Sequence, residues 1–513
     1  MKCDLVVAIP GAQSYENTFV RMDCHQSLGA AEIPKVINMY RLRYWFVHTH
    51  FALVMSALLT IPILAADKPV KVYILSGQSN MVGIGQVTGG GSRWGSEFIA
   101  PVLSVYPGKF DPSSDYEKLE PTKTLKLDSF GGVKPTPYPG GGTQIVRGFI
   151  QINTTGVYEF RPGYDRSTYN IMEVDGQEVY RRETGEDAVH TPIKLTADKK
   201  VPFRITYLND QANGLGWTAR VDIPGTLATV VKQDGKFPYL VDRQGNWGQR
   251  DDVWYKGVVT ATANKWLSVG CGAGSNNIGP ELGFGSIVGN YHDEPVLILK
   301  ASQGNRSLGW DYLPPGSERF DQDGFIYAGY KDSPARWEKD STPMPINWYA
   351  GKQYDDCFNA AHEVLDNFDT EFPHWKGRGY EIAGFVWWQG HKDGGEPHAS
   401  RYEQNLVHFI KTLRKEFESP LAPFVIATIG FDGWEMSGPH KIVADAQLAV
   451  SSDKGKHPEF KGNVLTVETR DFWRAPDVSP KNQGFHYNQN AETYMLVGEE
   501  LGNGMLKLLK ANE

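Results

Sequence analysis

The sequence predicts an α/β protein in which helices cover both faces of a parallel sheet, with an antiparallel β-sandwich inserted into it. Three observations predict this fold: short and nearly continuous apolar runs, amphipathic segments of helical period among them, and one long region of alternating apolar residues. Strands that alternate with helices favour a doubly wound sheet. A chain of 513 residues is long enough for two or three domains.

Five apolar runs have the length and composition of parallel strands that are buried on both faces. They are residues 70–77, 294–302, 381–390, 423–430 and 463–470. Helical period is found in residues 352–368, 402–417 and 491–509. Ligands of such sheets bind beyond the carboxyl ends of the strands, so polar residues just after these runs are candidates for a site.

Residues 103–236 have a different pattern, in which apolar residues such as Phe203, Ile205 and Tyr207 alternate between Gly, Asn, Asp and Pro turns. Asp175-Gly176 indicates a hairpin. We therefore expect an inserted β-sandwich at 103–236, between α/β segments at 67–102 and 237–513.

The first 66 residues predict a targeting segment rather than part of the fold. Arg41 and Arg43 precede the uncharged run 51–66, which ends in small residues. A basic stretch, an apolar core and a small-residue exit describe a secretory signal peptide that is cleaved near Ala66. Met39, just before the basic stretch, is a candidate for the true start of translation, and an uncleaved membrane anchor is the alternative to a signal peptide. Cleavage implies an exported protein with no integral membrane span.

The composition excludes some classes of function. A net charge of −8 without a Lys/Arg-rich block argues against a nucleic-acid-binding protein. No CxxC motif or Cys/His cluster is present, and the sequence after His362 lacks the second histidine of HExxH, so neither a metal nor another cofactor is expected. Cleavage would leave Cys271 and Cys357, either as a disulfide or as two buried thiols.

Ser79 directly follows the first predicted strand, in the sequence GQSNM. The pattern is not GxSxG, because Met81 replaces the second glycine. A serine at the start of a helix can be a nucleophile if a base lies within hydrogen-bond reach. It can also be a plain N-cap.

The motifs SGQSNM, IGPELGFG, KASQGNRSL, GFVWWQG and HYN occur in this order. Together they resemble the SGNH hydrolase superfamily, which has a flavodoxin-like sheet. Within it, they are similar to the carbohydrate esterases that include sialate O-acetylesterases and acetylxylan esterases. The inserted region resembles the carbohydrate module of the protective-antigen type. Some modules of that type bind sugars through calcium held by two aspartates, and here only Asp165 stands at the comparable place. Sugar binding and a rim that shapes the catalytic cleft both remain open for this insertion.

The resemblance implies a role for each matching residue. Ser79 would be the nucleophile and His486 the base that takes its proton. Ser79, Gly304 and Gln389 would form the oxyanion hole. Substrate contacts are expected from Gln78, Asn80, Asn305, Arg306, Trp388 and His391.

The acid that would orient His486 is missing from both places where the family carries one. Gln483 stands three residues before the histidine, and His391 follows WWQG. Asp393 is the first substitute, and Asp477, Glu396 and Asp311 are further acids. A Ser-His dyad oriented by a carbonyl or by Gln483 is the remaining alternative.

The sequence therefore predicts an exported serine esterase that removes O-acetyl groups from a carbohydrate. A non-catalytic sugar-binding protein on the same scaffold is the second hypothesis. A glycosidase is the third, although no pair of facing carboxylates stands out. The sugar and the oligomeric state are left open.

Overall fold

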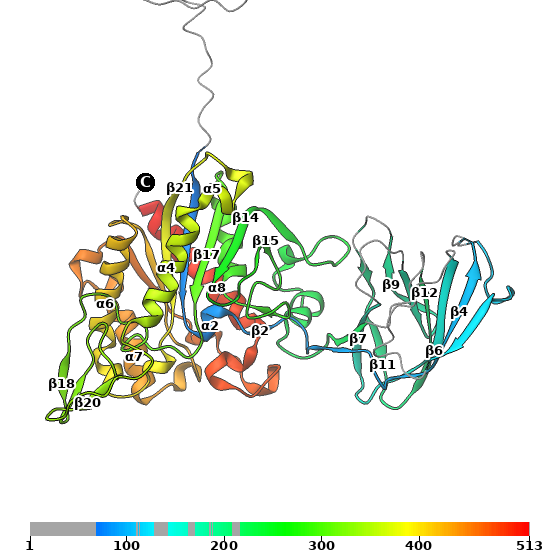
Figure 1. Cartoon of the computed structure of the whole chain (residues 1–513), viewed down its shortest axis with the longest axis horizontal. Coiled ribbons are helices and arrows are strands. Elements are labelled where there is room, and N and C mark those ends of the chain that lie inside the picture. The colour runs from blue at the N-terminus through cyan, green and yellow to red at the C-terminus, as the bar shows by residue number, and fades with distance from the viewer. Residues whose placement is uncertain are drawn as a thin grey trace, which may run out of the picture. The chain divides into compact units, whose positions relative to one another are not determined.

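The computed structural model describes residues 68–511, apart from 109–110, 112, 128–141, 163–169, 184–185, 187 and 208–215. The described residues form a seven-stranded sheet flanked by helices, together with antiparallel sheets (Figure 1). The predicted signal peptide, with Arg41, Arg43 and Met39, lies outside the described residues, as does Asp165. None of the described helices combines the length and the apolar character that crossing a membrane requires.

The seven-stranded sheet has the order β15-β14-β17-β1-β21-β22-β23. All neighbouring strands run parallel except β15, which pairs antiparallel with β14 at the edge. The strands are β1 Val70–Gly77, β14 Gln249–Val258, β15 Asn264–Ser268, β17 Val296–Ser302, β21 Tyr380–Trp388, β22 Phe424–Ala427 and β23 Val464–Val467.

The five predicted apolar runs coincide with β1, β17, β21, β22 and β23. β14 and β15 were not predicted, because β14 alternates buried residues with charged ones instead of forming a continuous apolar run. Helices α4, α6 and α8 confirm the three predicted helical segments, whereas α3 and α7 were not predicted. The bounds are α3 Glu281–Tyr291, α4 Lys352–Asp366, α6 His398–Glu416, α7 Gly438–Ala449 and α8 Ala491–Ala511.

Adjacent tryptophans on β21 show that helices cover both faces of the sheet. The Trp387 ring packs against Phe409 of α6, with ring centroids 4.4 Å apart. The Trp388 ring packs against Tyr494 of α8, with centroids 5.5 Å apart. Consecutive strand residues point to opposite faces, so α6 and α8 lie on opposite sides of the sheet. This agrees with the predicted α/β class.

A buried ion pair anchors the segment that follows β1. The Lys300 Nζ of β17 lies 2.8 Å from Glu281 Oε2 at the start of α3, and both side chains are fully buried. The same ammonium group donates to the carbonyl oxygen of Val82 at 2.9 Å. Val82 ends the short helix α2, Ser79–Val82, so the pair fixes this helix to the sheet.

Two antiparallel sheets lie between β1 and β14 in the sequence. Their orders are β10-β9-β8-β12-β6-β4-β5 and β11-β7-β13-β3. One hydrophobic cluster includes residues of both sheets, such as Val146 of β6 and Phe160 of β7.

Asp175 and Gly176 have φ angles of 51° and 78° and join β8 to β9, which confirms the predicted hairpin. These strands begin at Gly91, earlier than the predicted boundary at residue 103. The bounds are β3 Gly91–Arg93, β4 Phe98–Pro107, β5 Lys123–Lys126, β6 Gly142–Gln151, β7 Gly156–Arg161, β8 Asn170–Val174, β9 Gln177–Arg182, β10 Val189–His190, β11 Ile193–Leu195, β12 Lys200–Tyr207 and β13 Trp217–Arg220.

Short elements complete the fold, and both described cysteines are free. The elements are β2 Gly85–Gln86, β16 Asn277–Ile278, β18 Phe320–Gln322, β19 Phe325–Tyr327, β20 Arg336–Glu338 and α5 Phe368–Glu371. Cys271 and Cys357 are buried free thiols, so they do not form the disulfide that the sequence allowed.

Lys300→Met is expected to destabilise the protein by about 3–5 kcal/mol, because Glu281 would remain buried without its partner. The measurement is the free energy of unfolding in urea. The matched control is Lys411→Met, which removes a solvent-exposed pair with Glu459 and should cost at most about 1 kcal/mol. Equal losses for the two variants would contradict the role given to the buried pair.

Candidate active site

Ser79 lies at the carboxyl end of β1, where the chain turns directly into α2. Gly77 makes this turn possible. Its φ angle is 152°, and a Cβ atom on it would lie 2.1 Å from the carbonyl oxygen of Trp388. Only glycine therefore allows the ends of β1 and β21 to approach this closely.

The hydroxyl of Ser79 lies beside the imidazole of His486. The distance from Ser79 Oγ to His486 Nε2 is 3.0 Å, although the two residues are 407 positions apart in the sequence. His486 lies in the irregular 3₁₀ segment η10, Gly484–Gln489, which precedes α8. The expected pairing of hydroxyl and imidazole is present at the edge of the sheet.

A chain of glutamine amides orients the other side of the imidazole. His486 Nδ1 lies 3.0 Å from Gln483 Oε1. Gln489 Nε2 donates to the same oxygen at 2.7 Å, and Gln86 Nε2 donates to Gln489 Oε1 at 2.6 Å. Because Gln483 presents its oxygen, Nδ1 carries the hydrogen and the lone pair of Nε2 faces Ser79. Sequence reasoning missed Gln86 and Gln489, since their contacts depend entirely on the tertiary fold.

Burial keeps the His486 imidazole neutral. It lowers the pKa of His486 to about 4, and the nearby His391 lowers it further in the same direction. Burial likewise lowers the pKa of His391 to about 4, and the nearby charges of His440 and Lys392 act in the same direction. A neutral imidazole at neutral pH is the form that can accept a proton.

The expected acid partner is not a carboxylate of this site. Among the described residues, His486 forms no ion pair or hydrogen bond with a carboxylate. Asp393 was the first substitute, and this prediction is wrong: its two oxygens accept from the backbone N–H groups of Leu308 and Gly309, both at 2.8 Å, and from Gln389 Nε2 at 2.6 Å. Burial raises the pKa of the Asp393 carboxyl against the effect of these donors.

The further acids also make their contacts elsewhere. Asp311 accepts from the N–H and hydroxyl of Ser307, and Glu396 accepts from the hydroxyl of Ser400. Asp477 lies in a separate 3₁₀ turn, η9, Pro476–Val478. The alternative in which Gln483 orients a Ser-His dyad fits the geometry.

Gln389 is not placed to stabilise an oxyanion. Its Nε2 donates to the carbonyl oxygen of Arg306 at 3.0 Å as well as to Asp393, so both amide hydrogens are used. Its Oε1 accepts from the hydroxyl of Tyr402 at 2.8 Å. The prediction that Gln389 completes the oxyanion hole is therefore wrong for this conformation, because the side chain joins two loops instead.

The two amides that flank Ser79 are buried and bind neighbouring loops. Gln78 Oε1 accepts from the backbone N–H groups of Gly390 and Lys392, at 3.1 and 3.3 Å. Asn80 Nδ2 donates to the carbonyl oxygen of Phe485 at 3.3 Å. Only 4% of Gln78 and 3% of Asn80 is exposed, so neither is placed to contact substrate as predicted.

Gly304 lies next to Ser79. A Cβ atom on Gly304 would be 3.7 Å from the Cβ atom of Ser79. Among the described residues, the backbone N–H groups of Ser79 and Gly304 have no acceptor in the protein. Asn305 follows in the left-handed region, with φ 56°, and its side chain is exposed. Asparagine adopts this conformation more readily than most residues.

The remaining predicted contacts divide between the surface and the core. The Arg306 guanidinium stacks on the Trp348 ring at 4.4 Å and donates to Gln353, and 27% of the side chain is exposed. His391 stacks on His440, with ring centroids 5.0 Å apart, beside Phe485. Trp388 is 1% exposed, so the expectation that it stacks on a sugar is wrong.

No group of three or more His, Cys, Asp or Glu side chains converges as a metal site within the described parts of the chain. The groups brought together at this edge are a hydroxyl, a neutral imidazole and two unpaired backbone N–H groups. These groups suit acyl transfer, in which a serine attacks a carbonyl and N–H groups bind the developing oxyanion.

Comparison with solved structures gives distant similarities. A protein from Arabidopsis thaliana is 15% identical, over 51% of this chain and 87% of its own, with a TM-score of 0.31. A carbohydrate acetylesterase from Xanthomonas citri is 12% identical, over 70% and 72%, with a TM-score of 0.30. A family 2 carbohydrate esterase with a carbohydrate binding domain, from Corynascus thermopiles, is 12% identical, over 80% and 99%, with a TM-score of 0.26. Scores this low carry no argument about function.

The family comparison is more specific. Residues 260–507 match the model described as carbohydrate esterase, sialic acid-specific acetylesterase. This segment contains Gly304, Gln389 and His486, while Ser79 precedes it. The comparison with curated proteins gave no significant match. This match favours an enzyme over the non-catalytic sugar-binding protein. Over residues 260–507 the chain is similar to this family of carbohydrate esterases, and the match identifies it as a carboxylic ester hydrolase.

Proposed function

We propose that the protein hydrolyses O-acetyl esters on carbohydrates, with Ser79 as the nucleophile and His486 as the general base. The observation that carries this proposal is the distance of 3.0 Å between Ser79 Oγ and His486 Nε2. The tautomer that Gln483 selects supports it, because the lone pair of Nε2 faces the hydroxyl.

The proposed reaction has two steps. Ser79 Oγ attacks the acetyl carbonyl carbon while His486 Nε2 takes the hydroxyl proton, and the protonated imidazole then gives this proton to the departing sugar oxygen. Water next attacks the acetyl carbonyl carbon of the acetyl-enzyme, and His486 takes a proton from it. The bond from Ser79 Oγ to this carbon then breaks, Ser79 receives the proton from His486, and acetic acid leaves. The N–H groups of Ser79 and Gly304 would bind the oxyanion in both steps.

Gln483 would take the orienting role that a carboxylate has in other serine hydrolases. Its oxygen accepts the Nδ1 hydrogen and so holds the tautomer and the ring plane. Because the amide is neutral, it provides no counter-charge for the imidazolium. The low pKa of His486 accords with this neutral partner.

Substrate contacts are proposed for Asn305 and Arg306, in the loop after β17, and for His391, in the loop after β21. The side chain of Asn305 is exposed directly beside Gly304. The Arg306 guanidinium is held in place by Trp348 and Gln353 and remains partly exposed, so it can donate to a sugar hydroxyl or carboxylate. His391, beside Phe485 and near His486, is a third candidate.

Export and a separate carbohydrate module complete the proposal. The basic and apolar pattern at Arg41, Arg43 and residues 51–66 supports secretion. The antiparallel sheets share one hydrophobic cluster, which supports a β-sandwich module inserted into the esterase domain.

Ser79→Ala should lower the turnover of p-nitrophenyl acetate at least about a thousandfold, because the acyl-accepting oxygen is removed. Circular dichroism would verify that the variant is folded. Ser341→Ala, which changes a serine in an exposed loop, serves as the control and should retain the wild-type rate. Turnover by Ser79→Ala at the wild-type rate would remove Ser79 from the mechanism.

The pH profile of kcat/KM tests the neutral partner of His486. The base must be unprotonated, so the wild-type rate should fall as the pH drops through about 4, the pKa of His486. Gln483→Glu places a carboxylate beside Nδ1 and raises this pKa, so the acid limb should move up by about 1–3 pH units.

Gln249→Glu is the control for this prediction, because it makes the same change of charge at an exposed position on β14. Its acid limb should coincide with that of the wild type. An unchanged limb in Gln483→Glu would show that residue 483 does not face the imidazole in solution.

A further inference from the structure

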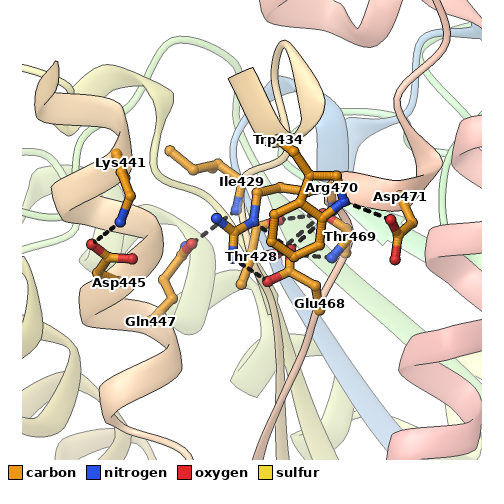
Figure 2. A network of polar contacts seen from close by, with 10 residues as sticks. All are labelled: Thr428, Ile429, Trp434, Lys441, Asp445, Gln447, Glu468, Thr469, Arg470 and Asp471. Atoms are coloured by element: carbon orange, nitrogen blue, oxygen red, sulfur yellow. Dashed lines mark hydrogen bonds and ion pairs between the residues drawn. The ribbon is translucent and has the colours of Figure 1, made fainter. Parts of the chain in front are cut away.

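Trp434 is an exposed tryptophan that is held rigidly. It lies in the 3₁₀ turn η5, Gly433–Glu435, between β22 and α7, and 59% of the residue is exposed. Figure 2 shows its ring above the Arg470 guanidinium, whose carbon lies 4.1 Å from the ring. The indole Nε1 donates to Asp471 Oδ1 at 2.6 Å.

The groups beneath the indole are themselves fixed. Arg470 donates to both carboxylate oxygens of Glu468, at 2.9 and 2.6 Å, and its backbone N–H donates to the first of them. Glu468 also accepts from the hydroxyl of Thr428 at 3.2 Å, which joins the end of β22 to the end of β23. The orientation of the Trp434 ring is therefore set before any ligand arrives, which lowers the entropy cost of binding.

Trp434 lies at the same edge of the sheet as Ser79. β22 and β23 run parallel to β21, and β21 runs parallel to β1, so the turns after these strands lie at one edge. Trp473 joins the two regions: a Cβ atom on Gly433 would lie 3.5 Å from Trp473 Cβ, and one on Gly484 would lie 3.6 Å from Trp473 Cη2. One tryptophan side chain thus separates η5 from the segment that carries His486.

We propose that Trp434 is the stacking platform of a second sugar subsite, which binds a pyranose ring next to the acetylated sugar. This inference rests on the proposed function and adds a preference for oligosaccharides. A pyranose presents an apolar C–H face that suits an exposed indole, and its hydroxyls can bond to polar groups at the ring edge. The exposed Asp471 carboxylate, beside the indole nitrogen, is such a group. Phe485, 43% exposed, adds an apolar surface next to His486.

The experiment compares substrates that share an acetyl ester and differ in the number of sugar rings. Wild type and Trp434→Ala are assayed with p-nitrophenyl acetate and with acetylated xylose, mannose and sialic acid, each as a monosaccharide and as an oligosaccharide. For at least one sugar, the wild type should have a lower KM for the oligosaccharide. Trp434→Ala should raise the KM for that oligosaccharide. The factor of this increase should be at least about ten times the factor by which the variant changes the KM for p-nitrophenyl acetate. Trp434→Phe, which keeps a smaller ring, should have an intermediate effect.

Leu421→Ala is the matched control. Leu421 is 74% exposed and lies just before β22, at the opposite edge of the sheet. Its removal should therefore change neither the KM for the oligosaccharide nor the KM for p-nitrophenyl acetate. Equal losses by Trp434→Ala on all substrates would indicate a structural role and overturn the proposal. A wild type that never prefers an oligosaccharide, or a Trp434→Ala variant without a KM effect, would overturn it as well. Failure of the esterase mechanism would appear separately, as unchanged p-nitrophenyl acetate turnover by Ser79→Ala.

Discussion

The buried carboxylate of Asp393 holds together the edge of the sheet on which the site is built. Its three N–H donors come from two different loops, the one after β17 and the one after β21. If these loops separated, the Asp393 carboxylate, which is 1% exposed, would lose its hydrogen-bond donors. The protein interior around it could not replace them. The position of Gly304 beside Ser79 therefore depends on a residue that has no hydrogen bond to either Ser79 or His486.

The amides on both sides of Ser79 extend this constraint to Ser79 itself. Gln78 binds the loop after β21, and Asn80 binds the segment that carries His486. Two residues that are 407 positions apart are thus held at hydrogen-bond distance by side chains adjacent to one of them. A plain turn would not need these amides, whereas a site built from three separate loops does. The groups around the imidazole are mostly neutral, so burial determines its pKa.

The sequence predicted the parts of this fold that depend on continuous local patterns. Apolar runs identified the five central strands, and helical period identified α4, α6 and α8. β14 carries alternating charges because it lies near the sheet edge, so its sequence has no continuous apolar run that would predict a strand. α3 and α7 contain glycine or proline, so their helical period was too weak to predict a helix. Ser79 and His486 were predicted from motifs. The partners of Gln389 and Asp393 were not, because hydrogen bonds between loops are set by the tertiary fold and leave no local period.

The tryptophans of this edge show why a motif on a central strand does not predict an exposed ring. Trp388 was expected to contact the substrate, but β21 lies between two helical layers, so α8 covers the Trp388 ring and α6 covers the Trp387 ring. A strand in the centre of a sheet with helices on both faces has no free face for a ligand. Trp434 lies in a turn beyond a strand end, where 59% of the residue is exposed, and its neighbours Arg470 and Asp471 fix it from below and from the edge. In this architecture, rings that contact a ligand must come from turns. A tryptophan in a turn needs polar neighbours such as Arg470 and Asp471 to hold its ring in one orientation. These supports come from the segment after β23, far from Trp434 in the sequence, so no local motif indicates them.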